Sequence, residues 1–235
     1  LHRIARRQRQ MCIRDRIAIL AISFVSFLGI QSASAVEGVT VGVALNTAAF
    51  MGSGKETMTG SGGDATKKKI TEEDGAFKKD GIASIFVEYA ANDMISVGIE
   101  RFADDVSTPS NLNVQQASGA DVNNTVKATF KDHTTVYANV NMPFGTYLKL
   151  GYHMVDILTQ ESLATGSKYN DVDTNGISVG LGYQYNADNG VFFRAEVSAS
   201  EYDDVDATST VDSSKVVEVK EMYGATGAIK IGKTF

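Results

Sequence analysis

Residues 177–198 read ISVGLGYQYNADNGVFFRAEVS. Apolar side chains occupy every second position on either side of a central polar segment: Ile177, Val179, Leu181 and Tyr183 before it, and Val191, Phe193, Ala195 and Val197 after it. Alternation with a period of two is typical of a β-strand that buries one face. The central segment, residues 186–190, contains Asn, Asp and Gly and is short enough for a turn between antiparallel strands. Residues 177–198 therefore predict a β-hairpin.

The same alternation recurs along the rest of the chain, in residues 39–46, 83–89, 95–100, 136–142, 148–154 and 225–235. Most of these segments have about the length that a tilted strand needs to cross a bilayer. No stretch of helical period lasts three turns after Val36. The pattern predicts an all-β fold with about eight antiparallel strands.

The connections between these segments alternate between short and long. Residues 91–93, 143–146 and 186–190 are short, whereas four connections are long and polar: 51–81, 103–134, 159–176 and 203–216. Short turns at one end and long loops at the other are typical of an up-and-down transmembrane β-barrel. We expect the four long segments to be extracellular loops.

The two faces of the predicted strands differ in chemistry. One face is aliphatic or aromatic, and the other is mostly small and polar, with seven ionisable residues: Glu88, Glu100, Lys149, His153, Arg194, Glu196 and Lys230. A soluble barrel would turn the apolar face inward, and a membrane barrel would turn it outward to the lipid. The alternation alone does not decide between these two orientations. If lipid lies outside, these seven residues face the lumen. In a barrel of eight strands the lumen is narrow and is filled by side chains. We then expect a buried charge network in place of an open pore, because an unpaired buried ion is costly.

The N-terminal region favours the membrane alternative. Arg14-Asp15-Arg16 precedes an apolar run, residues 17–30, and an Ala-x-Ala motif at Ala33 and Ala35 follows it. This order is typical of a cleavable signal peptide. We expect residues 1–35 to be an extension plus signal peptide, with cleavage after Ala35, and residues 36–235 to be one barrel domain.

Charge excludes some functions. Residues 36–235 carry 16 Lys and Arg against 27 Asp and Glu, a net charge of −11, which argues against nucleic-acid binding. His133 and His153 are the histidines of this part, and neither has a neighbouring serine that would form a hydrolytic site with it. We expect no enzyme activity, no cofactor and no metal site.

A few residues depart from the lipid-facing pattern or mark its limits. Arg101 and Lys233 lie on the apolar face but near strand ends, where a long side chain reaches the interface. Aromatic residues of the same face lie near strand ends and are expected to form an interfacial girdle: Tyr89, Tyr183, Tyr185 and Phe193.

Three motifs resemble those of a known family. Residues 147–152 read YLKLGY, residues 182–185 read GYQY, and residues 193–196 read FRAE, before a last strand that ends in Phe235. In this order they resemble the opacity-type and OmpA-type outer-membrane β-barrels of Gram-negative bacteria, a porin-like superfamily. The resemblance covers most of residues 136–235, with only the general alternation matching earlier.

The resemblance implies a location in the outer membrane, with lipopolysaccharide as a neighbour. It also implies that Ile229, Ile231 and Phe235 form the signal read by the barrel assembly machinery, from which Gly227 and Lys233 depart. We expect a monomer with a structural or surface-interaction role through its long loops, which offer a possible ligand site. The alternatives are a narrow channel for ions or small apolar solutes and a secreted soluble barrel that binds a ligand.

Overall fold

The computed structural model describes residues 38–60, 68–117, 120–163, 168–187 and 189–235, and nearly all of them lie in strands. The predicted signal peptide, with Ala33 and Ala35, lies outside the described residues. The strands are β1 (Val39–Thr59), β2 (Lys68–Ala90), β3 (Ile95–Phe102), β4 (Val106–Ser107), β5 (Asn111–Ala117), β6 (Ala120–Asn141), β7 (Thr146–Leu163), β8 (Val172–Asn186), β9 (Val191–Tyr202), β10 (Val205–Thr208) and β11 (Lys215–Thr234). No helix within the described ranges is long and apolar enough to cross a membrane.

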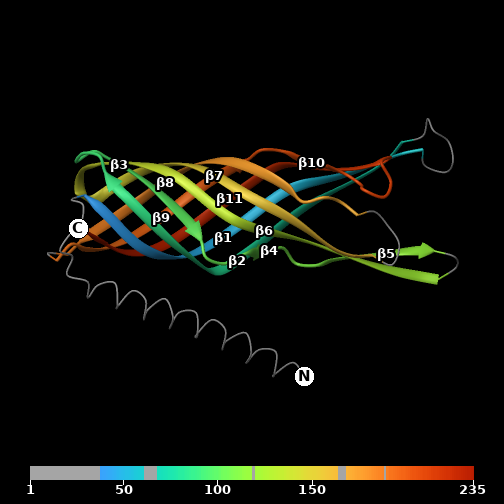
Figure 1. Ribbon diagram of the computed structural model, residues 1–235, viewed down its shortest axis with the longest axis horizontal. Helices are drawn as coiled ribbons and strands as arrows, with labels where there is room; N and C mark the ends of the chain where they lie inside the picture. Colours follow the sequence, from blue (N-terminus) through green and yellow to red (C-terminus); the bar gives the residue numbers. More distant parts are fainter. Residues whose placement is uncertain (1–37, 61–67, 118–119, 164–167, 188) are drawn as a thin grey trace, which may run out of the picture.

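Eight of these strands form a closed ring. The order is β1-β2-β3-β6-β7-β8-β9-β11, and β11 pairs with β1 to complete it. Each neighbouring pair is antiparallel, so the ring leaves no free edge around its circumference (Figure 1). This arrangement confirms the prediction of an up-and-down barrel with eight strands.

The short turns, the first described residue and the C-terminus lie at the same end of the barrel. The one-turn helix Pro143–Gly145 joins β6 to β7, and the C-terminus lies at that end in Figure 1. The backbone N–H of Gly38 donates to the carbonyl of Phe235 at 2.9 Å, which ties the start of β1 to the end of β11. Because short turns are periplasmic in transmembrane barrels, this end faces the periplasm.

The outer surface next to this end is apolar. Large side chains that are each 45–65% exposed form a belt around the ring: Leu45, Ile85, Val87, Tyr89, Val97, Ile99, Val136, Leu150, Tyr152, Ile177, Val179, Leu181, Tyr183, Tyr185, Phe193, Val197 and Ile229. We call these residues the apolar belt. A belt of this kind around a closed ring of strands is suited to lipid, because every backbone group is paired within the ring. The predicted orientation, with the apolar face outward, holds for this half of the molecule.

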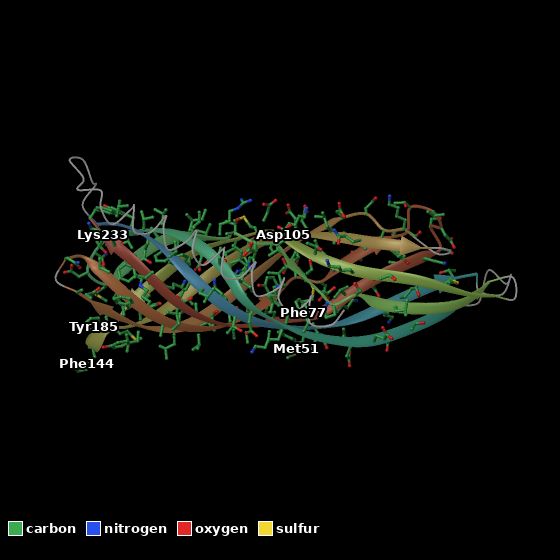
Figure 2. The ribbon with its side chains drawn as sticks, turned by 90° about the horizontal axis from the view of Figure 1, so that it is seen from below. Met51, Phe77, Asp105, Phe144, Tyr185 and Lys233 are labelled. Atoms are coloured by element: carbon green, nitrogen blue, oxygen red, sulfur yellow. The ribbon has the colours of Figure 1, made fainter. Side chains whose placement is uncertain are left out.

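The two charged exceptions lie at opposite ends of the belt. Arg101 pairs with Asp132 at the end away from the turns. The Lys233 ammonium lies 5.3 Å from the centre of the Phe235 ring, at the periplasmic end. Figure 2 places Tyr185 and Phe144 at the periplasmic end as well, where an interfacial girdle belongs.

Glycines on the inner face make room for aromatic rings. Four glycines lie directly opposite an aromatic residue of the next strand, in the pairs Gly42–Phe86, Gly98–Tyr137, Gly182–Tyr147 and Gly232–Phe192. In each pair a Cβ on the glycine would overlap the ring atoms of its partner. The rings therefore lie flat on the inner wall, which lets a narrow lumen hold both aromatic and charged side chains.

The prediction of four long loops is wrong, because much of their length is strand. Residues 51–81 contain the outer parts of β1 and β2, which pair from Ser53 with Asp74 to Thr59 with Lys68. Residues 103–134 likewise contain β4, β5 and most of β6. In Figure 2, Met51 and Asp105 lie about halfway along the molecule, so the strands continue far beyond the belt. We call the part beyond this level the outer half.

The outer half is made of two sheets that face each other. One contains β2, β1, β11 and β10, and the other contains β5, β4, β6 and β7. On one side a bridge between Tyr169 and Ser209 joins them. On the other side β3 pairs with β2 only from Ser84 to Ala90, and no described strand continues this pairing along the outer part of β2. The ring is therefore closed within the belt and open on one side above it (Figure 1).

Candidate functional site

A buried ion pair lies in the lumen near the periplasmic end. The Arg194 guanidinium, from β9, donates to both carboxylate oxygens of Glu88, from β2, at 2.7 and 2.8 Å. The Tyr137 hydroxyl and the Asn139 amide also donate to Glu88, at 3.1 and 2.9 Å. Glu88 thus has four donors, which is the kind of compensation that a carboxylate removed from water requires.

A second cluster lies beside this pair, with two lysines shared between two carboxylates. The Lys149 ammonium lies 3.0 Å from oxygens of both Glu100 and Glu196. The Lys230 ammonium lies 2.6 Å from Glu100 and 3.4 Å from Glu196. Ser84 donates to the other oxygen of Glu100 at 2.7 Å. The charges of this cluster balance.

Aromatic rings fill the space around these charges. Phe86 and Phe192 are 1% and 0% exposed, and their ring centres lie 6.3 Å apart. The Tyr147 hydroxyl donates to Glu196 at 2.9 Å. The ionic side chains are themselves only 2–7% exposed. We call this set of three carboxylates, three cations and surrounding rings the charged plug.

Six of the seven residues predicted for the lumen network lie in the charged plug. The seventh, His153, bonds to His133 and Thr135 above it. The tyrosines and Asn139 that complete the plug were not predicted. The sequence indicates these tyrosines and Asn139 only weakly. They occupy inward-facing positions of the strands, as the charged residues do, and nothing else marks them.

Above the charged plug the chemistry of the two faces is exchanged. On β7 the inward residues change from Lys149 and His153 to Val155 and Ile157, which are 4% and 7% exposed. The outward residues change at the same level, since Met154 is followed by the exposed Asp156. The belt half is therefore apolar outside and charged inside, whereas the outer half is polar outside and apolar inside.

The inward side chains of the outer half line a cavity of about 760 Å³. Most of its lining is aliphatic or aromatic: Phe50, Phe77, Val106, Phe130, Val155, Ile157, Val172, Tyr202, Val205, Val217, Val219 and Met222. This volume lies within the range of cavities that hold small molecules. The chemistry of the walls suits an apolar occupant.

Three phenylalanines cross the open side of the ring at the base of this cavity. Phe50 and Phe77 are opposite each other on β1 and β2, with ring centres 5.3 Å apart. Phe130, from β6 on the far side of the opening, lies 6.0 Å from both rings. The rings are within 30° of parallel, so they hold the two sheets together where backbone pairing is absent.

A β-bulge directs His133 into the lumen. Between the pairs Lys131–Asp156 and Thr134–Met154, β6 has two residues where β7 has one, and Asp132 has a φ of 51°. Asp132 consequently points outward to Arg101, and His133 points inward. Bulges that redirect a side chain in this way are common next to functional sites.

His133 and His153 form the boundary between the cavity and the charged plug. Nε2 of His133 lies 3.0 Å from Nδ1 of His153, and the Thr135 hydroxyl lies 2.8 Å from the same Nδ1. His133 is 7% exposed, packs edge-on against Phe102 with ring centres 4.3 Å apart, and lines the cavity. His153 was predicted to face the lumen, but its contact with His133 was not predicted, because that contact depends on the bulge.

Within the described ranges, no group of three or more His, Cys, Asp or Glu side chains is arranged to hold a metal ion. The histidine pair forms a hydrogen bond with Thr135. It forms none with a serine or carboxylate among the described residues. The chemistry available at this boundary is hydrogen bonding by two imidazoles.

No protein-family model matches the chain, and no curated protein matches it. The chain is similar to several solved structures. The outer membrane protein OprG from Pseudomonas aeruginosa is 12% identical over 85% of this chain and 97% of its own, with a TM-score of 0.47. The outer membrane protease OmpT from Escherichia coli is 10% identical over 87% and 99%, with a TM-score of 0.46. Ail, the attachment invasion locus protein of Yersinia pestis, is 12% identical over 85% and 100%, with a TM-score of 0.34.

The location follows from the molecule itself. A closed ring with an even number of antiparallel strands, short turns at one end and an apolar belt is the architecture of bacterial outer-membrane proteins. The chain is therefore an outer-membrane β-barrel, as the sequence predicts, and the charged plug lies within the membrane.

Proposed function

We propose that this outer-membrane β-barrel is a non-enzymatic binding protein that holds a small apolar molecule in its outer half. The observation that carries the proposal is the apolar cavity of about 760 Å³ above the charged plug. The apolar side chains that line this cavity point inward, and the outer surface at this level is polar. These apolar side chains therefore do not serve to contact lipid. The sequence predicts surface interaction through long loops. We propose instead that the molecule binds its ligand in the cavity between the two sheets of the outer half.

The open side of the ring supports the same function. Ala76 and Phe77 of the outer part of β2 line the cavity, and β3 does not pair with this part of the strand. We propose that an apolar molecule enters there, on the outer side of the three stacked phenylalanines, without passing through the charged plug.

A probe that fluoresces in apolar surroundings tests this function. N-phenyl-1-naphthylamine is titrated into the full chain in lipid nanodiscs, with empty nanodiscs subtracted, and the absence of Trp keeps the protein background low. We expect saturable binding that Ile157→Asn weakens roughly tenfold, because a polar group then replaces part of the apolar wall.

The matched control is Leu158→Asn, since Leu158 follows on the same strand and is not part of the cavity lining. It should bind the probe as the unmodified chain does. Equal loss in both variants, or a signal no greater than that of empty nanodiscs, would refute binding in the cavity.

The channel alternative makes a different prediction. A lumen in which three carboxylates and three cations are 2–7% exposed and surrounded by rings leaves no continuous water path. We therefore expect no discrete conductance steps in planar bilayers, under conditions in which a general porin shows them. Regular steps in the reconstituted chain would assign it an ion-conducting role.

A further inference from the structure

The floor of the apolar cavity includes a buried imidazole, beside the ring of Tyr202. His133 is 93% buried, since only 7% of it is exposed, and it is the side chain of the histidine pair that lines the cavity. The charged residues of the lining, Glu56, Glu73 and Lys127, lie toward the strand tips, at the other end of the cavity. A ligand that fills the cavity therefore meets mainly aliphatic and aromatic walls and, at its inner end, the imidazole of His133 beside Tyr202.

Hydrogen bonding within the pair leaves one ring nitrogen free on each histidine. Nε2 of His133 and Nδ1 of His153 bond to each other, so Nδ1 of His133 and Nε2 of His153 remain. Nε2 of His153 is buried and has no partner among the described residues. No hydrogen bond of the described part of the chain uses Nδ1 of His133 either. Buried polar groups normally have partners, so the unpaired Nε2 of His153 calls for an explanation.

The shared bond couples the two free nitrogens. When His133 donates to His153, its own Nδ1 is an acceptor; when His153 donates to His133, Nδ1 of His133 carries a hydrogen and is a donor. The neutral pair therefore has two tautomeric states, with Nδ1 of His133 an acceptor in one and a donor in the other. Their exchange moves one proton across the shared bond, removes one from Nε2 of His153 and adds one to Nδ1 of His133. A hydroxyl group, which both donates and accepts, matches either state.

The charges near the histidine pair restrict the kind of head group that the ligand can have. The plug below the pair contains Glu88, Glu100 and Glu196 against Arg194, Lys149 and Lys230, and these charges balance. A charged head group at the floor would lose its hydration without gaining a counter-ion. An uncharged head group loses less and gains the hydrogen bond.

We propose that the His133–His153 pair is the polar end of the cavity, and that the ligand is a compound with an apolar body and one uncharged hydroxyl head that bonds to His133. This inference rests on the proposed function and adds the class of ligand and the residue that selects it. His133 thus acts as a specificity-determining residue.

Three ligands that share an unbranched ten-carbon body and differ in the head group test the inference: 1-decanol, 1-chlorodecane and decanoate. Each displaces N-phenyl-1-naphthylamine from the full chain in nanodiscs. We expect 1-decanol to bind about threefold to tenfold more tightly than 1-chlorodecane, as one added hydrogen bond allows. Decanoate should gain no such advantage.

Two variants assign the preference to His133. His133→Phe keeps an aromatic ring against Phe102 and leaves Thr135 bonded to His153, so it should bind both neutral ligands equally and 1-chlorodecane as before. His133→Gln returns a hydrogen-bonding group and should recover part of the preference for 1-decanol. In ¹⁵N-histidine spectra, 1-decanol should shift the imidazole signals of His133 and His153, while 1-chlorodecane should not.

The outcomes separate this inference from the proposed function. If 1-decanol and 1-chlorodecane bind the unmodified chain equally, or if His133→Phe keeps the preference, the role of the histidine pair is wrong and the apolar cavity remains a binding site. If decanoate binds most tightly, the uncharged head is wrong. If no ligand displaces the probe and the probe itself does not bind, the proposed function fails and this inference fails with it.

Discussion

Replacing Arg194 by methionine is expected to lower the free energy of unfolding by about 3–5 kcal/mol. The substitution keeps an unbranched chain in the lumen but removes both hydrogen bonds to the Glu88 carboxylate. Glu88 is 5% exposed, so water does not replace the lost donors. The Tyr137 and Asn139 bonds remain, and they are too few to stabilise a buried negative charge without its cation.

The measurement is urea-induced unfolding in phospholipid vesicles, followed by the loss of the compact band on an unheated denaturing gel and by circular dichroism. The chain has no Trp, so fluorescence does not report unfolding in the usual way. The compact band should disappear at a lower urea concentration in the Arg194→Met variant than in the unmodified chain.

A double variant separates the uncompensated charge from lost packing. Arg194→Met with Glu88→Gln removes both charges, and the Gln oxygen still accepts from Asn139 and Tyr137. We expect it to recover most of the lost stability. If the double variant unfolds as early as the single one, the ion pair does not account for the effect, and loss of the Arg194 side chain above Phe192 explains it instead.

The barrel itself was predictable because the signal for it is local. Alternation with a period of two is visible in any eight-residue window, and each segment of the belt half, such as residues 177–184, keeps the same parity inward and outward. The inward charges followed from the same parity. Their partners did not, because the pairing of Glu88 with Arg194 joins residues 106 positions apart and depends on how the ring closes.

The outer half departs from the prediction because polar composition does not distinguish a loop from a strand that lies outside the membrane. Residues 68–80 are rich in Lys, Glu and Asp and read as a solvated loop, yet they form the outer part of β2. One side of a strand outside the membrane faces water, so polar residues are compatible with it. The change in the residues that follow His153, with Val155 and Ile157 on the inward parity and Asp156 outward, was the available signal.

The cavity was missed for the same reason. From the sequence, a membrane barrel and a soluble ligand-binding barrel are alternatives, and each implies one orientation of the apolar face for the whole chain. The chain uses both orientations in succession, with the bulge at Asp132 close to the level where they exchange. A single choice of orientation therefore described the belt half and not the outer half.

This exchange predicts that substitution by arginine has effects of different size at two positions on the same face of β8. Leu181 is 53% exposed and lies near the middle of the belt, whereas Asp173 points outward from the same strand above it. Leu181→Arg is expected to destabilise the folded barrel by about 2–4 kcal/mol, the effect of an arginine at the middle of the bilayer. Asp173→Arg should change stability by about 1 kcal/mol or less, because water solvates the new charge there.

Unfolding by urea in vesicles measures both variants, and the comparison does not depend on lumen packing because neither side chain points inward. In a barrel surrounded by water, Leu181→Arg would be a surface substitution with an effect within about 0.5 kcal/mol. Equal stability of the two variants would therefore refute the lipid-facing assignment of the apolar belt. A large loss for Leu181→Arg alone would place the outer limit of the membrane between Leu181 and Asp173, the stretch of β8 in which Gly176 pairs with His153.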